Sequence, residues 1–175
     1  MLKGERVYLR LMEQRDIALI CNMLDDEEMQ RYDNSKLNKS EIEFILKNFN
    51  KIRKLYNRTL TIVNSRNVIV GSISYDKMNE IEDKVVYSIG ITIGRRYWNR
   101  GYGKDAVSTL VEYLFNSKGA DLIRLEVVRE NARAINCYKS VGFEEKYTSE
   151  ECLGKNIIIM TLEKNNLLEN SIRLE

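Results

Sequence analysis

The sequence predicts a mixed α/β fold in a single domain, and three observations support this prediction. The spacing of apolar residues changes repeatedly between the periods of helices and of strands. In the middle of the chain a predicted strand, a long helix and another strand follow one another, which favours a parallel strand pair inside a mixed sheet. A length of 175 residues is typical of one domain. We therefore expect one domain over 1–175, with 164–175 as a C-terminal tail.

The first half of the chain predicts a strand, two helices and a β-hairpin. Weak alternation predicts the first strand, over 7–11, and helical spacing predicts the first helix, over 15–24. A second amphipathic helix is expected to begin at Ser40, which would form a capping box with Glu43. The hairpin is expected from two β-rich segments around a polar turn, at 59–64 and 68–75.

The second half of the chain is predicted to form a strand, a helix, a strand, a short helix and two closing strands. The long helix presents a continuous apolar face and is the clearest element of the chain. The expected ranges, in order, are 85–93, 103–117, 122–128, 132–141, 143–148 and 156–162.

The composition excludes several classes of function. The chain has no histidine, which excludes Ser-His-Asp and Cys-His nucleophile systems and leaves acid–base chemistry to Tyr, Lys, Asp, Glu, Cys or water. Its three cysteines have no CxxC spacing, so neither a disulfide framework nor a metal site is expected. A net charge of +2 gives no sign of a nucleic-acid partner. Without a signal peptide or a long apolar run, we expect a cytoplasmic protein with no membrane partner.

The segment between the strand at 85–93 and the long helix predicts an anion site. Gly101 and Gly103 lie where the chain turns into the helix, whose first N–H groups lack intrahelical partners. Basic side chains surround the same turn, namely Arg95, Arg96, Arg100 and Lys104. A tight turn alone would explain the two glycines equally well, and the Walker and GxGxxG phosphate-binding patterns are absent.

A second segment, 130–143, has a structural explanation for each notable residue. Asn131 is a good N-cap for the short helix, and Gly142 is a good residue to end it. Tyr138 lies on the apolar face and is, by its position, a core aromatic.

Taken together, the two segments resemble the GNAT superfamily of acetyl-CoA-dependent N-acetyltransferases. Residues 97–103 (YWNRGYG) are similar to the pyrophosphate loop of the branch that contains ribosomal-protein N-terminal and spermidine acetyltransferases. Residues 131–143 are similar to the family pattern Asn-x-x-Ala/Ser-x-x-x-Tyr-x-x-x-Gly-Phe, and the resemblance covers about residues 5–163. It implies a GNAT fold, with a mixed, mostly antiparallel sheet of six to seven strands, splayed into a V and flanked by about four helices.

The resemblance also implies acetyl-CoA as cofactor. Main-chain amides of the loop would hold its pyrophosphate, the strand before the loop would bind its pantetheine arm, and Asn131 would hydrogen-bond that arm. The implied cofactor-binding residues are Ile91, Thr92, Ile93, Arg96, Trp98, Asn99, Arg100, Gly101, Tyr102, Gly103, Lys104, Asn131 and Asn136.

In the implied mechanism an amine attacks the thioester directly, and Tyr138 is the general acid. A main-chain N–H near Ile91 or Ile93 would hold the oxyanion. Many relatives have a carboxylate near the start of the central strand, but the aligned residue here is Ser88. Acidic residues of the segment 25–33 are candidate substitutes on the acceptor side, although a solvated loop would also explain them; they include Asp26, Glu28 and Asp33.

The sequence does not identify the acceptor amine. A protein N-terminal α-amine, a polyamine and another small amine are all compatible with the sequence, and a homodimer is possible. The alternative to an enzyme is a non-catalytic acyl-CoA-binding regulatory module on the same fold, which would not need Tyr138.

Overall fold

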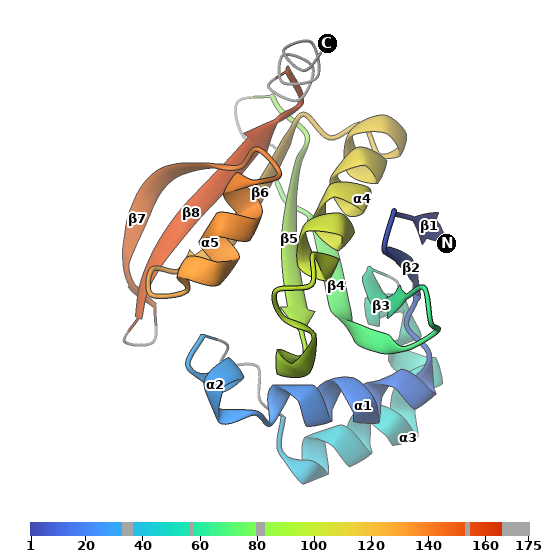
Figure 1. The fold of residues 1–175 in the computed structure, drawn as a ribbon. Coiled ribbons are helices and arrows are strands. Elements are labelled where there is room, and N and C mark those ends of the chain that lie inside the picture. Colours follow the sequence, from blue (N-terminus) through green and yellow to red (C-terminus); the bar gives the residue numbers. More distant parts are fainter. Residues whose placement is uncertain (33–36, 57, 80–82, 153–154, 166–175) are drawn as a thin grey trace. The chain divides into compact units, whose positions relative to one another are not determined.

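The computed structural model describes residues 1–32, 37–56, 58–79, 83–152 and 155–165. They form a sheet of eight strands in the hydrogen-bonded order β1-β2-β3-β4-β5-β6-β8-β7 (Figure 1). The strands are β1 (Leu2–Lys3), β2 (Val7–Leu11), β3 (Thr59–Asn64), β4 (Ile69–Lys77), β5 (Val86–Ile93), β6 (Leu122–Val128), β7 (Glu144–Cys152) and β8 (Lys155–Glu163). The helices are α1 (Gln14–Leu24), α2 (Glu27–Gln30), α3 (Lys39–Tyr56), the 3₁₀ turn η1 (Arg95–Tyr97), α4 (Tyr102–Ser117) and α5 (Ala132–Lys139).

The mixed, mostly antiparallel sheet is confirmed, but it has more strands and helices than expected. β5 and β6 are parallel, whereas β2–β3, β3–β4, β6–β8 and β7–β8 are antiparallel. The extra strand is β1, in which two residues pair with Leu9 and Tyr8. The extra helix is α2, with four residues. Elements this short show no periodicity in a sequence, so the expected six to seven strands and about four helices were too few.

The described chain divides into two compact units. Unit 1 consists of Met1–Ser74 and Ile91–Ala106, and unit 2 of Tyr75–Gly90 and the chain from Val107 on.

In unit 1, α1 and α3 lie side by side (Figure 1). Ile17, Cys21 and Phe49 form a buried cluster between them, with partly buried apolar residues around it. The cap of α3 differs from the expected Ser40–Glu43 box. Asn38 accepts hydrogen bonds from the Glu41 N–H (3.0 Å) and the Ser40 hydroxyl (2.5 Å), and its own N–H donates to the Glu41 carboxylate (2.7 Å). The helix therefore begins earlier, because Asn38 is also a strong N-cap residue.

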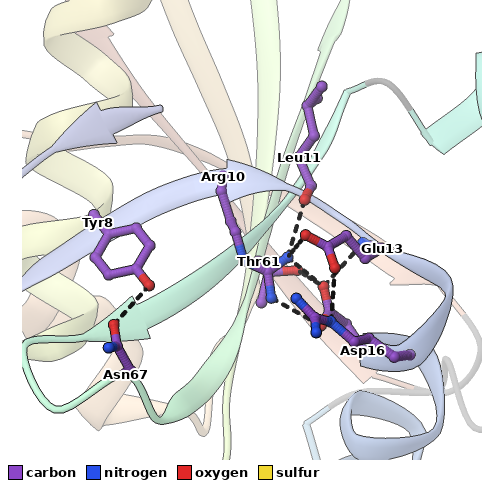
Figure 2. Close-up of polar contacts among 8 residues, drawn as sticks. Tyr8, Arg10, Leu11, Glu13, Asp16, Thr61 and Asn67 are labelled. Carbon is purple, nitrogen blue, oxygen red and sulfur yellow. Dashed lines mark hydrogen bonds and ion pairs between the residues drawn. The ribbon is translucent and has the colours of Figure 1, made fainter.

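Asp16 ties α1 to strands β2 and β3 in the same unit (Figure 2). Its carboxylate is fully buried and accepts hydrogen bonds from the Arg10 guanidinium at 2.6 and 2.9 Å. The Glu13 N–H (2.9 Å) and the Thr61 hydroxyl (2.8 Å) donate to it as well. A charge without exposed surface is tolerated here because it is paired and its oxygens have hydrogen-bond donors.

In unit 2, β6 pairs with β8 along its whole length, and β7 pairs with the other edge of β8. The parallel β5–β6 ladder covers only Val86–Ser88 against Leu122–Arg124. Apolar side chains of α4, β6 and β8 form the core of this unit, and the fully buried ones include Leu110, Leu114, Ile123, Leu125, Met160 and Leu162. Across both units, no helix in the described ranges is long and apolar enough to span a membrane.

Candidate functional site

The first predicted site is the turn of unit 1 that leads from β5 into α4, and we call residues 94–104 the glycine loop. Asn99 and Gly101 have positive φ angles of 56° and 77°. These left-handed residues turn the chain so that consecutive N–H groups face the same way, which is the geometry of an anion-binding nest. Gly103 lies in the first turn of α4, which begins at Tyr102, one residue before the expected start at Gly103.

The glycine loop offers a run of backbone donors. Trp98 donates its N–H to the Arg95 carbonyl, and Asp105 donates to the Gly101 carbonyl as the first helical hydrogen bond of α4. Between them, the N–H groups of residues 99–104 have no hydrogen-bond acceptor in the described part of the chain. Six adjacent amides at a helix N-terminus attract an anion, because the helix dipole and the free N–H groups act together.

Contacts within unit 1 hold the glycine loop in place. The Trp98 indole N–H donates to the Ile93 carbonyl at 2.6 Å, and the Gly94 N–H donates to the Val70 carbonyl at 3.0 Å. A Cβ on Gly94 would lie 2.9 Å from the sulfur of Met23, so the Met23 side chain of α1 would have to shift to admit a side chain there. Trp98 thus has a structural task in addition to its predicted place in the cofactor site.

Asp105, which the sequence did not single out, anchors the loop from the helix side. Its carboxylate accepts hydrogen bonds from the N–H groups of Glu5 (3.0 Å), Arg6 (2.8 Å) and Val7 (2.9 Å). This anchoring also brings Arg6 to the loop: its Cδ and Nε lie 3.4 Å from the point where a Cβ on Gly101 would sit. About a hundred residues separate these partners in sequence, so no local pattern could have indicated the contact.

Not all basic side chains of the glycine loop are available to bind an anion. Arg95 forms an ion pair with Asp26 at 3.6 Å. The Arg96 guanidinium lies 5.8 Å from the centre of the Tyr97 ring, a cation–π contact, and Arg96 is an exposed residue. Arg100 and Lys104 are exposed beside the free amides.

The acidic segment before α3 is partly helical rather than a solvated loop. Asp26 is the N-cap of α2 and accepts hydrogen bonds from the N–H groups of Glu28 (3.0 Å) and Met29 (3.4 Å). Glu28 also pairs with Arg31 at 3.4 Å. Asp26 and Glu28 therefore have structural partners within unit 1, and their role toward an acceptor stays a prediction. Asp33 lies outside the described residues.

In unit 2 the expected cap at Asn131 and the expected burial of Tyr138 are confirmed, whereas the end of the helix differs. The Asn131 side chain caps α5 by accepting a hydrogen bond from the Ala134 N–H at 3.1 Å. Asn136 is exposed on α5, whereas Tyr138 is 7% exposed and packs edge-on against Phe143, with ring centres 6.0 Å apart. The helix ends at Lys139 with Ser140 as its C-cap, two residues earlier than the expected end at 141, so Gly142 with its φ of 109° lies beyond the helix end rather than directly after it.

Two further predicted regions lie on β5. Ile91 and Thr92 are half-buried and Ile93 is buried in unit 1. Ser88 is half-buried in unit 2 and lies opposite Arg124 of β6. The described residues contain no cluster of three His, Cys, Asp or Glu side chains that could hold a metal ion.

The chain is similar in sequence to known acetyltransferases. A family model described as an acetyltransferase (GNAT) domain matches residues 6–144. Over 146 residues the chain is 25% identical to the uncharacterized N-acetyltransferase p20 of Bacillus licheniformis, which covers 81% of this chain and 81% of that protein.

Two solved structures show the same fold. The spermidine N-acetyltransferase of Vibrio cholerae, in complex with CoA and spermine, has a TM-score of 0.77 at 20% identity, covering 93% of this chain and 98% of that one. The aminoglycoside acetyltransferase AAC(6')-Ib, in complex with coenzyme A, has a TM-score of 0.75 at 18% identity, covering 94% and 99%. Since the family model matches most of its length, the chain belongs to the GNAT acetyltransferase family.

Proposed function

We propose that this protein is an N-acetyltransferase that transfers an acetyl group from acetyl-CoA to a primary amine. Acetyl-CoA is the acetyl donor of its family. The observation that carries the proposal is the glycine loop, in which six adjacent N–H groups have no acceptor in the described residues. A pyrophosphate supplies several anionic oxygens, so it fits such a row of donors better than a single water does.

The residues present fit coenzyme A. The amides of 99–104 would hold its pyrophosphate, and the exposed Arg100 and Lys104 would add positive charge. The Trp98 amide is excluded from that set, because it already donates to the Arg95 carbonyl. Backbone groups of Ile91–Ile93 would pair with the pantetheine arm as a strand does. When bound, the cofactor supplies an activated acetyl thioester.

Two residues of unit 2 have proposed roles in the reaction. We assign Tyr138 as the general acid, whose hydroxyl would give its proton to the leaving group. The Tyr138 ring is buried and packs against Phe143, which fixes the position of that hydroxyl. Asn131 uses its side-chain oxygen to cap α5, which leaves the amino group of the same amide for the pantetheine arm.

The proposal also concerns the identity of the acceptor amine. The names of similar proteins include spermidine and aminoglycoside acetyltransferases, which supports a small amine. A polyamine, another small amine and a protein N-terminal α-amine remain the candidates, in a cytoplasmic protein.

The cofactor assignment can be tested by thermal unfolding with CoA and with pantetheine, which lacks the phosphates. We expect CoA at about a hundred times its Kd to stabilise the fold by about 2.7 kcal/mol. Pantetheine at the same concentration should have little effect, because it cannot use the glycine loop.

Gly101→Ala should remove most of the CoA effect. The substitution strains a residue at φ 77° and places a methyl group 3.4 Å from Arg6. Gly119→Ala is the matched control, since Gly119 also has a positive φ of 67° but has open space around it. Equal stabilisation by CoA and pantetheine, or an intact CoA effect in Gly101→Ala, would contradict the assignment.

A further inference from the structure

We propose that Arg6, in the segment before β2, binds the pyrophosphate of CoA together with the amides of the glycine loop. The inference rests on the proposed acetyltransferase function and adds to its cofactor site a residue that lies outside the loop. Arg6 is an exposed residue of unit 1, to which the glycine loop also belongs. Two segments that are far apart in sequence would thus share one anion.

Three hydrogen bonds to Asp105 hold the backbone of the Arg6 segment against the first turn of α4. The N–H groups of Glu5, Arg6 and Val7 donate to the Asp105 carboxylate at 3.0, 2.8 and 2.9 Å. One carboxylate oxygen accepts from Glu5, and the other accepts from both Arg6 and Val7. The point from which the Arg6 side chain extends is thereby fixed beside the start of the helix.

The same contacts keep the Asp105 carboxylate away from the free amides of the glycine loop. An acidic side chain in the first turn of a helix is ordinarily attracted to the free N–H groups there. Both Asp105 oxygens are instead occupied by the segment before β2. The N–H groups of residues 99–104 therefore keep no acceptor among the described residues, and an anion finds them unoccupied.

The Arg6 side chain lies against Gly101, the left-handed glycine of the loop. Its Cδ and Nε lie 3.4 Å, and its Cζ 3.8 Å, from the point that a Cβ on Gly101 would occupy. The Gly101 nitrogen is close to that same point by standard backbone geometry, so the Arg6 Nε and the Gly101 nitrogen lie within about 6 Å of each other. Two hydrogen bonds of about 2.9 Å each reach across such a distance through one phosphate group.

The charge of Arg6 is available, unlike that of two arginines inside the loop. Arg95 pairs with Asp26, and Arg96 makes a cation–π contact with Tyr97. The Arg6 guanidinium has no ion pair within the described ranges of the chain. Backbone amides carry no net charge, whereas a guanidinium adds a full positive charge and several N–H donors that suit phosphate oxygens. Arg6 can therefore supply charge that the amides alone lack.

Arg6→Gln should raise the Kd of CoA about tenfold, because a charged hydrogen bond to a phosphate is lost. Isothermal titration calorimetry of the purified protein measures this value. Dephospho-CoA, which lacks the 3′-phosphate but keeps the pyrophosphate, should show the same loss. Pantetheine has neither phosphate and should bind the variant and the wild type alike.

Arg15→Gln is the matched control for the loss of charge. It removes the same charge from unit 1, at a side chain that is 77% exposed and pairs with Glu13. The Kd of CoA should stay at the wild-type value in this variant. Arg6→Lys keeps the positive charge without the planar fork of donors, so its Kd should lie between those of wild type and Arg6→Gln.

Two further measurements distinguish binding from a structural role of the Arg6 side chain. The melting temperature without CoA should be equal in wild type and Arg6→Gln, because Asp105 holds the backbone N–H of residue 6 and not its side chain. In the enzyme assay KM for acetyl-CoA should rise with the Kd, while kcat at saturating acetyl-CoA and KM for the amine stay the same.

The outcomes separate this inference from the proposed function. If CoA does not bind the wild-type protein, the cofactor assignment fails and the inference fails with it. If CoA binds wild type and Arg6→Gln equally, or if Arg6→Lys binds no better than Arg6→Gln, only the inference is overturned. A loss that disappears with dephospho-CoA would assign Arg6 to the 3′-phosphate and overturn the inference, as would an equal loss with pantetheine.

Discussion

At the scale of single residues, the Asp16 carboxylate shows how unit 1 stabilises a buried charge. Burial by itself raises the pKa of this carboxyl, but the hydrogen bonds from Arg10, the Glu13 N–H and Thr61 lower it more, so the pKa lies below its usual value. The same contact with Asp16 raises the pKa of Arg10. Since the folded pKa is depressed, the stabilisation is complete above the unfolded pKa of about 3.9 and disappears as the pH falls through the lower folded value.

Asp16→Asn should lower the free energy of unfolding by about 3 kcal/mol at pH 7, because Arg10 loses its charged partner inside the protein. Urea unfolding at several pH values measures the effect. The difference between wild type and variant should shrink below about pH 4, where the carboxyl of the unfolded wild type takes up its proton, and should continue to shrink until the folded carboxylate is protonated as well. Glu13→Gln, at a side chain that is 46% exposed, is the control and should cost much less. A difference that stays constant down to pH 2 would show that the charge is not responsible.

Tyr138→Phe should lower kcat about a hundredfold and leave the thermal effect of CoA unchanged. The variant removes only the hydroxyl and keeps the buried ring against Phe143, so the fold should be preserved. Turnover is measured by release of the CoA thiol. Tyr147→Phe, which alters a tyrosine that is 58% exposed on β7, is the control. Full activity in Tyr138→Phe would remove the general-acid role and favour the non-catalytic acyl-CoA-binding module.

At the scale of elements, the close approach of β4 and β5 positions the start of the glycine loop. A Cβ on Gly71 of β4 would lie 1.9 Å from the Thr92 carbonyl oxygen, and the Gly94 N–H donates to the Val70 carbonyl. Only glycine fits at position 71, because the obstacle is backbone that cannot rotate away. The same contact fixes the residues of β5 that are proposed to bind the pantetheine arm.

Gly71→Ala should therefore destabilise the protein by about 3 kcal/mol or more, since backbone must move to admit the methyl group. Gly119→Ala, where the surroundings are open and only the positive φ is strained, should cost about 1 kcal/mol. Chemical denaturation of both variants measures the two values. Equal costs would mean that the β4–β5 contact is looser than the structure shows.

At the scale of the whole molecule, the two units share covalent elements. β4, β5 and α4 each begin in one unit and end in the other. A strand that loses its pairing in one unit is thereby weakened in the other, which favours a single unfolding transition. The expectation of one domain over 1–175 stays a prediction that unfolding experiments can check.

We expect the thermal transition followed by tryptophan fluorescence to coincide with the transition followed by far-ultraviolet circular dichroism. Trp98 is the only tryptophan and lies in unit 1, whereas circular dichroism reports helices and strands of both units. A separate second transition in the dichroism signal would show that the units unfold independently.

The order and type of the longer elements followed from sequence alone, because their apolar spacing reflects which face is buried. The range 122–128 agrees with β6 at both ends, and the predicted helix over 15–24 differs from α1 by one residue. The capping residues in the sequence predicted the ends of helices less reliably. Ser40 and Asn38 are both good caps, and only the folded chain shows that Asn38 is used.

The composition, the two motifs and their order determined the family of this protein, because each depends on residues close together in the chain. Tertiary structure alone decided which of those residues are free to act. It engaged Asp26 with Arg95, brought Arg6 to Asp105 beside the glycine loop, and aligned Ser88, Arg124 and Thr161 across the sheet. These contacts join residues far apart in sequence, and their geometry is set by strand register and helix packing, which no local pattern encodes.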